Sequence, residues 1–270
     1  MTEWATARTR GHRAVVDGFR GVVTATFRHA VYVTPTEGDL LVVHDVQHGP
    51  TPTSLLVDFD HLRPVMPGAP VVGRANHLLL GDVVVDARTA RVWSPPSAPR
   101  SGMRAAPERP SEAGVDGGLV DELVGALGPS HDPAGLPDVL RRLVGRGVGV
   151  TPSGDDAIVG VLAVLHRCAH PTAAAGPIDA LTAAIPPLLE RTTPISAHFL
   201  RLALRGELGE RLVSVVDACC TPTGPDPAAI DRLLATGATS GADALAGVIA
   251  AESLAAHPVA AHSRTPAEVA

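Results

Sequence analysis

The sequence predicts an α+β protein in which an N-terminal antiparallel β-barrel or sandwich is followed by an all-helical domain. Three observations support this prediction. Short Val-rich segments punctuated by Gly, Pro and Asp fill residues 1–94. Apolar residues then recur at helical spacing over residues 117–257. Between the two patterns, residues 95–116 are rich in Pro, Ser and Arg, which is typical of a linker or an exposed loop.

Six segments of the first region have the β-branched, apolar composition of strands. They are residues 13–19 (RAVVDGF), 21–27 (GVVTATF), 30–34 (AVYVT), 39–46 (DLLVVHDV), 53–59 (TSLLVDF) and 82–87 (DVVVDA). Their short length and close spacing favour a barrel or a sandwich over a parallel sheet with crossover helices.

Helices are predicted over the rest of the chain, separated by Pro and Gly. Two are expected over residues 118–128 and 135–147, and further helices begin near Ser153, Pro177, Ile195, Gly209, Pro227 and Gly241. The last residues, 258–270, are expected to form a disordered tail.

Composition excludes several classes of function. The net charge is −6 and the chain contains no Lys, which argues against a nucleic-acid binder, a phosphate-loop NTPase and Schiff-base chemistry. No apolar run is long enough to cross a bilayer, and the N-terminus lacks the apolar segment of a signal peptide. Cys168, Cys219 and Cys220 make a poor disulfide framework, so we expect a cytoplasmic protein. From the charge and the absence of a long apolar run, we expect it to bind neither nucleic acid nor membrane.

The helical region contains an internal repeat. The segment TPSGDDAIVGVLA begins at Thr151, and ATSGADALAGVIA begins at Ala238. An ungapped alignment gives seven identities in thirteen positions, including a shared Ser-Gly-x-Asp core. The repeat predicts two related helix starts.

The repeat has two interpretations. Ser153 with Asp156, and Ser240 with Asp243, have the spacing of a capping box, which contributes about 1 kcal/mol to a helix. Alternatively, the small residues that follow each Asp allow the two helices to pack closely about a pseudo-twofold axis. That packing would bring both N-termini and both carboxylates together, as a site for an anion, a shared proton or Mg²⁺.

Two further features exceed what capping requires. Asp155 has no acidic counterpart in the second repeat, where Ala242 stands, and the capping box does not need it. In the segment of residues 190–199, Thr193 is a predicted N-cap with a proline after it. Arg191 and Thr192 beside that cap have the chemistry to bind a carboxylate or a phosphate.

Three segments resemble the signature segments of the AllH family, formerly catalogued as a domain of unknown function. They are GVGVTPSGDDAIVGVL, RTTPISAHFLRLALRGELGE and GATSGADALAGVIA, and the resemblance extends more loosely to HGPTPTSLLVDF in the β-rich half. Two departures are Val150, where the family often has Leu, and Ala238, where His is common. The resemblance implies a subunit of oxamate carbamoyltransferase from anaerobic allantoin breakdown. That enzyme works with partner subunits and interconverts oxalurate plus phosphate with oxamate plus carbamoyl phosphate.

The leading hypothesis is therefore a carbamoyl-transfer subunit that binds a small anionic or carbamoyl substrate and works with other subunits of the complex. A homo-oligomer is also compatible with the sequence. Asp155, Asp156 and Asp243 are the predicted catalytic residues, with Mg²⁺ as an alternative occupant of the same carboxylates. The predicted substrate-binding residues, which supply hydroxyls, backbone N–H groups and a guanidinium, are Thr151, Ser153, Gly154, Arg191, Thr192, Thr193, Ser196, Thr239, Ser240 and Gly241. A non-catalytic ligand-sensing or assembly subunit and a Mg²⁺-dependent hydrolase are the alternatives.

Overall fold

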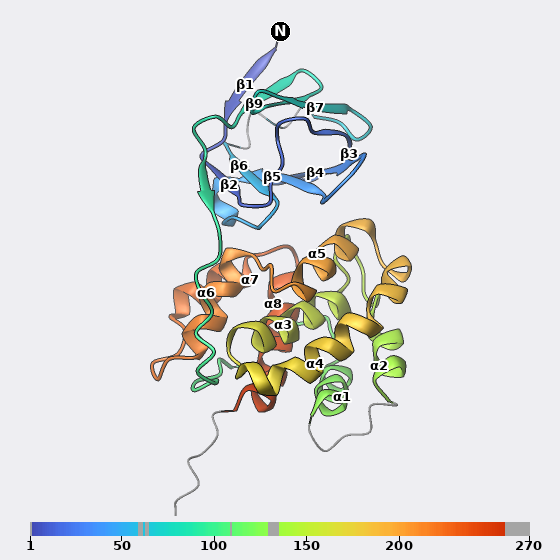
Figure 1. Ribbon diagram of the computed structural model, residues 1–270, viewed down its shortest axis with the longest axis vertical. Coiled ribbons are helices and arrows are strands. Elements are labelled where there is room, and N and C mark those ends of the chain that lie inside the picture. Colours follow the sequence, from blue (N-terminus) through green and yellow to red (C-terminus); the bar gives the residue numbers. More distant parts are fainter. Residues whose placement is uncertain (1, 59–61, 63–64, 109, 129–134, 257–270) are drawn as a thin grey trace, which may run out of the picture.

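A computed structural model describes residues 2–58, 62, 65–108, 110–128 and 135–256. The predicted α+β class is confirmed: a curled sheet precedes a helical region, and the two lie one above the other in Figure 1. The predicted tail of residues 258–270 lies outside the described residues. Among the described residues, no helix combines the length and the apolar composition that crossing a membrane requires.

Within the described residues, ten strands form one sheet in the order β1-β9-β8-β7-β3-β4-β5-β6-β2-β10. The strands are β1 (Glu3–Thr6), β2 (Thr9–Gly11), β3 (Arg20–Thr26), β4 (Ala30–Pro35), β5 (Leu41–Asp45), β6 (Ser54–Val57), β7 (Pro70–Arg74), β8 (His77–Leu80), β9 (Val83–Asp86) and β10 (Arg91–Trp93). The sheet is mixed, since β1–β9, β5–β6 and β2–β10 pair in parallel and the other neighbours are antiparallel. Its buried Val and Leu side chains form one core.

The strand predicted over residues 13–19 is wrong. This segment is a loop whose buried Val16 and Phe19 face the sheet core, so its apolar pattern reflects burial rather than strand pairing. The loop lies so close to β7 that a Cβ on Gly73 would stand 1.7 Å from the Val16 carbonyl oxygen. Five strands were not predicted from the sequence, because they are only three to five residues long: β1, β2, β7, β8 and β10.

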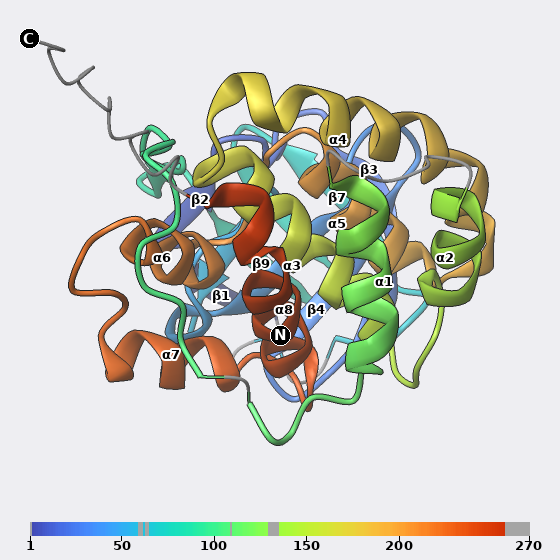
Figure 2. The ribbon, with the colours of Figure 1, turned by 90° about the horizontal axis from the view of Figure 1, so that it is seen from below.

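The helical region is built around two central helices, α3 and α8 (Figure 2). Its elements are α1 (Gly117–Leu127), α2 (Leu136–Leu143), α3 (Ser153–Arg167), α4 (Pro171–Ala184), η4 (Pro186–Arg191), α5 (Pro194–Leu204), α6 (Glu210–Cys219), α7 (Pro227–Leu234), α8 (Ser240–Ala250) and η5 (Ala251–Ala255). The helix predicted to start near Pro177 begins instead at Pro171, where a proline suits the first helical position. Pro177 lies inside α4.

The segment predicted as a linker or exposed loop is attached to the helices. The backbone N–H groups of Arg100 and Gly102 donate to carbonyls at the end of α3, at 2.8 and 2.9 Å. The N–H of Arg104 donates to the Cys219 carbonyl at the end of α6, also at 2.8 Å. Helix ends leave carbonyls without intrahelical partners, and this segment supplies donors for them. Met103 between these bonds is buried.

The small-residue faces of α3 and α8 meet as the repeat predicts. A Cβ on Gly160 would stand 2.0 Å from the Ala244 carbonyl oxygen, and a Cβ on Gly247 would stand 2.0 Å from the Ala157 carbonyl oxygen. Ala244 and Gly247 are the repeat counterparts of Ala157 and Gly160, so the two contacts are related by a pseudo-twofold axis. The predicted close packing of the two helices is confirmed.

The turns that lead into α3 and α8 are also equivalent. The N–H of Gly154 donates to the Arg146 carbonyl at 2.9 Å, and the N–H of Gly241 donates to the Thr236 carbonyl at 3.0 Å. A Cβ on either glycine would stand about 2 Å from a carbonyl oxygen in the last turn of the preceding helix, α2 or α7. The similarity of the repeat therefore extends from the helices into the loops before them.

The sheet contacts the helices through the loops beside β5 and β6. The Thr53 hydroxyl and the His198 Nε2 atom form a buried hydrogen bond of 3.0 Å. The N–H of Glu210, at the start of α6, donates to the Pro50 carbonyl at 2.9 Å. Ile195 of α5 packs into a small apolar cluster with residues of β4 and β5. These contacts hold one face of the sheet against the N-terminal ends of α5 and α6.

The close helix contact predicts a large effect for a single methyl group. Gly160→Ala should lower the free energy of unfolding by about 3 kcal/mol, because the added Cβ overlaps backbone that cannot move independently. Gly125→Ala is the matched control, because that exposed helical glycine has open space around it. It should raise stability by about 0.5–1 kcal/mol. Urea denaturation of both variants measures the difference, and equal stabilities would contradict the proposed packing constraint.

Candidate functional site

The N-terminal turns of α3 and α8 face each other. The Thr151 and Ser240 hydroxyl oxygens lie 2.7 Å apart and share a hydrogen bond across the pair. On the other side of the axis, a Cβ on Gly114 would stand 2.8 Å from the Ser153 Oγ atom and 3.8 Å from the Asp243 Oδ1 atom, which places those two side chains together. The structure thus brings both Ser-Gly-x-Asp turns into one cluster.

The predicted capping boxes are not formed. Pro152 occupies the N-cap position of α3 and Thr239 that of α8, and neither helix has a side-chain cap hydrogen bond. Ser153 and Ser240 are therefore the first helical residues rather than the caps. The Ser240 hydroxyl bonds across to the partner turn instead. Local capping does not account for the repeated serine and aspartate.

Each turn contributes a carboxylate oxygen that has no hydrogen-bond partner. Asp243 is fully buried, and its Oδ1 atom accepts a hydrogen bond of 2.8 Å from the N–H of Val115. Its Oδ2 atom and the Oδ2 atom of Asp156 are both buried and unpartnered within the part of the chain that the structure describes. A buried polar atom without a hydrogen-bond partner costs free energy of folding. These two oxygens are therefore candidates to accept hydrogen bonds from a ligand.

The environment of Asp156 favours its protonated form. Burial raises the pKa of the Asp156 carboxyl well above its usual 3.8, and the nearby charges of Asp243 and Asp155 raise it further. Hydrogen bonding to the Ser240 and Thr151 hydroxyls lowers the pKa but does not offset burial. A carboxyl in this state keeps its proton at pH values where an ordinary carboxyl has lost it, and can therefore deliver a proton.

Asp155 has a structural explanation that its sequence position does not reveal. Its side chain is buried, and Oδ1 accepts a hydrogen bond of 2.9 Å from the N–H of Gly145. Its Oδ2 atom accepts a bond of 2.7 Å from the Ser196 hydroxyl and another from the Thr192 hydroxyl. Asp155 thereby fastens the loop before α3 to the start of α5. Its catalytic role stays a prediction.

The Thr-Pro segment before α5 lies beside Asp155. The predicted N-cap is confirmed, because the Thr193 hydroxyl accepts a hydrogen bond of 3.0 Å from the N–H of Ser196. The same hydroxyl donates to the Val150 carbonyl. Arg191 is exposed, and its guanidinium donates to the Arg141 carbonyl at 3.1 Å. These side chains hold the loop before α3 in place.

Two predicted backbone donors are already occupied. The N–H groups of Gly154 and Gly241 donate to carbonyls of their own loops, as described above. Thr239 stays at the α8 turn, where its carbonyl accepts a hydrogen bond of 2.8 Å from the Asp243 N–H. The groups left to meet a ligand are thus mainly the side chains of Thr151, Ser240 and the two carboxyls.

Tyr32 of β4 lies near Asp156 on the sheet side, and the sequence did not single it out. Its ring packs with Val150, Ile195 and Phe199 between the sheet and the helices. Burial and the negative charge of Asp156 raise the pKa of the Tyr32 hydroxyl to about 12. The one available signal was that Tyr32 is the only tyrosine in a chain with 3% aromatic residues.

The three aspartates are not grouped as a metal site. Among the described residues, no set of three or more His, Cys, Asp or Glu side chains is arranged to hold a metal ion. The reason is visible at Asp155, whose two oxygens point away from the α3–α8 pair toward Gly145, Thr192 and Ser196. The Mg²⁺ interpretation therefore gains no support from the geometry.

Residues 143–252 match the family described as oxamate carbamoyltransferase subunit AllH. This part of the helical region is similar to the AllH family. This AllH segment runs from the last residue of α2 into η5 and covers less than half of the chain. It contains both facing turns and every site residue predicted from the sequence, whereas Tyr32 and the whole sheet lie outside it. No solved structure matched the chain.

The hydrogen bonds of Asp155 in the AllH segment predict a stability role. Asp155→Ala should lower the free energy of unfolding by about 3 kcal/mol, because it leaves the Gly145 N–H and two hydroxyls without an acceptor. Asp179→Ala, which removes an exposed carboxylate from α4, should change stability by less than about 0.5 kcal/mol. Urea denaturation checks both, and an undisturbed Asp155→Ala variant would contradict this role.

The raised pKa of Asp156 predicts a pH-dependent cost. Native Asp156 retains its proton at pH values where the unfolded chain has lost it, so stability falls as the pH rises from about 3.8 through the raised pKa. Asp156→Asn should remove this loss and raise the free energy of unfolding at pH 7 by about 1 kcal/mol. The gain should vanish toward pH 4. Urea denaturation across this range measures it, and a gain that is independent of pH would contradict the assignment.

Proposed function

We propose that this chain is a subunit of a carbamoyltransferase of the oxamate carbamoyltransferase kind, and that the carbamoyl group binds between Asp156 and Asp243. The match of residues 143–252 to the AllH family supports the reaction class. The proposed position of the carbamoyl group rests on one observation, the pair of buried Oδ2 atoms without hydrogen-bond partners, one from each half of the repeat.

The donor pattern of a carbamoyl group matches this pair. A carbamoyl NH₂ has two N–H donors and needs two acceptors when it is buried. The Asp243 side chain is already oriented by the Val115 N–H, which leaves Oδ2 as a fixed acceptor. Asp156 supplies the second oxygen, and its raised pKa suits it to give or take the proton that moves with the leaving group.

Transfer of a carbamoyl group passes through a state with negative charge on the carbonyl oxygen. The Thr151 and Ser240 hydroxyls, which meet between the turns, are donors that can stabilise this charge. The positive ends of the α3 and α8 dipoles point the same way. The hydroxyl of Tyr32 adds a donor from the sheet, beside Asp156.

The other predicted residues hold the site in place rather than contact the substrate. Thr192 and Ser196 hold Asp155, and Thr193 holds the Val150 carbonyl, so together they fix the loop that carries Thr151. Because the family description names a subunit, we propose that other carbamoyltransferase subunits complete the enzyme. Its substrates would be oxalurate and phosphate in one direction, and oxamate and carbamoyl phosphate in the other.

This function predicts a specific loss in the assembled enzyme. Asp156→Asn should reduce kcat for carbamoyl phosphate formation from oxalurate and phosphate by about 10²-fold or more, because it removes the proton-transferring group. The matched control is Asp179→Asn on the exposed face of α4, which should keep full activity. Product formation is measured with partner subunits present, and subunit assembly is measured by size-exclusion chromatography.

The same experiment separates the catalytic role from the non-catalytic one. Full activity of the Asp156→Asn complex would place the chemistry on another subunit and leave this chain a ligand-sensing or assembly role. Loss of assembly in that variant would likewise contradict a role confined to proton transfer.

A further inference from the structure

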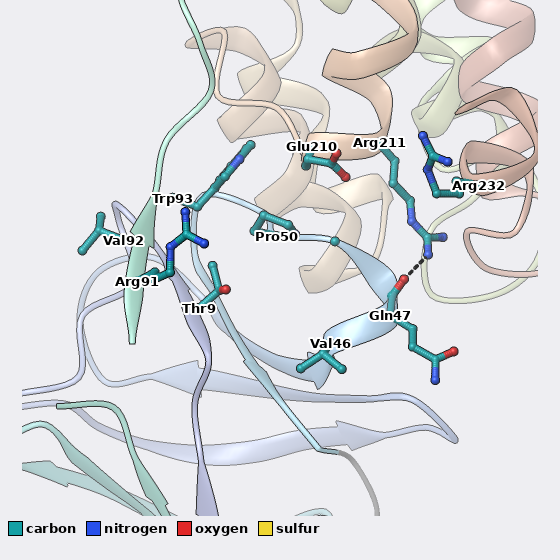
Figure 3. Close-up of a pocket in the computed structure, with 11 residues that line it drawn as sticks. Thr9, Val46, Gln47, Pro50, Arg91, Val92, Trp93, Glu210, Arg211 and Arg232 are labelled. Atoms are coloured by element: carbon teal, nitrogen blue, oxygen red, sulfur yellow. Dashed lines mark hydrogen bonds between the residues drawn. The ribbon is translucent and has the colours of Figure 1, made fainter. Parts of the chain in front are cut away.

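A pocket lies between the sheet and the helices, and none of its lining residues belongs to the α3–α8 cluster. Its volume is about 490 Å³, which is in the range of sites for small organic ligands. Its walls come from β10, from the segment around η1 (Val46–His48), and from α6 and α7 (Figure 3). Arg91 and Trp93 stand on the sheet side, and Arg211 and Arg232 stand on the helix side.

The pocket is positively charged in a chain whose net charge is −6. Three arginines, Arg91, Arg211 and Arg232, line it with a single carboxylate, that of Glu210. In the described part of the chain none of these three guanidiniums makes a salt bridge. Arg211 and Arg232 lie together on the helix wall, where Glu210 is the single lining carboxylate, and this net positive surface suits an anion.

Arg211 is held in place to meet a ligand. Its guanidinium donates to the Gln47 carbonyl and, at 3.2 Å, to the Thr236 hydroxyl, so two neutral acceptors from the sheet and the helices orient it. Burial and the positive charge of Arg232 both lower the pKa of Arg211, whereas Glu210 raises it. A dianion beside Arg211 and Arg232 would relieve the repulsion between the two guanidiniums.

The opposite wall offers an aromatic surface. Trp93 is one of two tryptophans in the chain, and it lines the pocket next to Arg91 on β10. An indole face stacks well on a planar ring, and a volume of about 490 Å³ leaves room for such a ring beside a phosphate group. The two walls therefore suit the two ends of one ligand.

We propose that this pocket binds a nucleotide-like organic phosphate, with its planar ring against Trp93 and its phosphates on Arg211 and Arg232. The proposal goes beyond the carbamoyl site, because the pocket contains neither Asp156 nor Asp243. Arg211 nevertheless bonds to Thr236, whose carbonyl accepts the Gly241 N–H at the α8 turn. Arg211 would thus link the ligand to the loop that leads into one of the two facing turns.

The test is calorimetric titration of the full chain in magnesium-free buffer with ADP, adenosine and inorganic phosphate as probes. ADP should bind at least about tenfold more tightly than either fragment, since only ADP uses both walls. Absence of ADP binding, or phosphate binding as tight as that of ADP, would overturn the proposal. No turnover is measured, so this result is independent of the carbamoyltransferase assay.

Two substitutions locate the bound probe. Arg232→Gln should lower the affinity for ADP by about tenfold or more. It should have little effect on folding, because Arg232 is exposed and makes no hydrogen bond among the described residues. Arg20→Gln removes an equally exposed arginine from β3, outside the pocket, and should leave ADP affinity unchanged. Equal losses in the two variants would show nonspecific charge attraction and overturn the site.

Fluorescence gives a second readout. In a Trp4→Phe background Trp93 is the only tryptophan, so ADP should change its emission with the same affinity that calorimetry finds. Trp4 lies on the edge strand β1 and is 59% exposed, so its replacement should be tolerated. Saturable calorimetric binding without any change in Trp93 emission would place ADP elsewhere and overturn the assignment.

Discussion

The contact between the backbones of α3 and α8 is the constraint on which the rest of the helical region depends. Gly160 and Gly247 allow each helix to press against a carbonyl of the other, and any side chain there would separate them. This approach brings the N-terminal turns of the two helices together, where the Thr151 and Ser240 hydroxyls share a hydrogen bond. Asp156 and Asp243 are therefore buried next to each other, and the raised pKa of Asp156 follows from that burial.

Burying two carboxyls with unpartnered oxygens costs stability, and the structure offsets the cost nearby. The Asp155 carboxylate accepts three hydrogen bonds and fastens the loop before α3 to α5. The Gly154 and Gly241 N–H groups close the two equivalent loops. These hydrogen bonds fix the loops around the two unpartnered carboxyl oxygens, and fixed surroundings are what a preorganised site requires.

Sequence alone could predict the helix pairing because its signal is periodic: Asp and Gly recur on one helical face in both repeats. It could not predict that Pro152 takes the N-cap of α3, which moves Ser153 into the helix and removes the capping box. The role of Asp155, the approach of Tyr32 and the arginine pocket all depend on residues that are far apart in the chain. Only the folded topology brings such residues together.

The two halves of the repeat have similar folds but different polar environments around their aspartates. This difference favours different roles for Asp156 and Asp243. Asp243 is oriented by a backbone N–H from the segment before α1, a fixed donor that suits a constant acceptor. Asp156 instead meets hydroxyls from Thr151 and Ser240, which can rotate and exchange donor and acceptor roles. Two carboxyls placed in unequal surroundings can take unequal roles, one binding and the other moving a proton. A symmetric pair of capped helices would have no need for this difference.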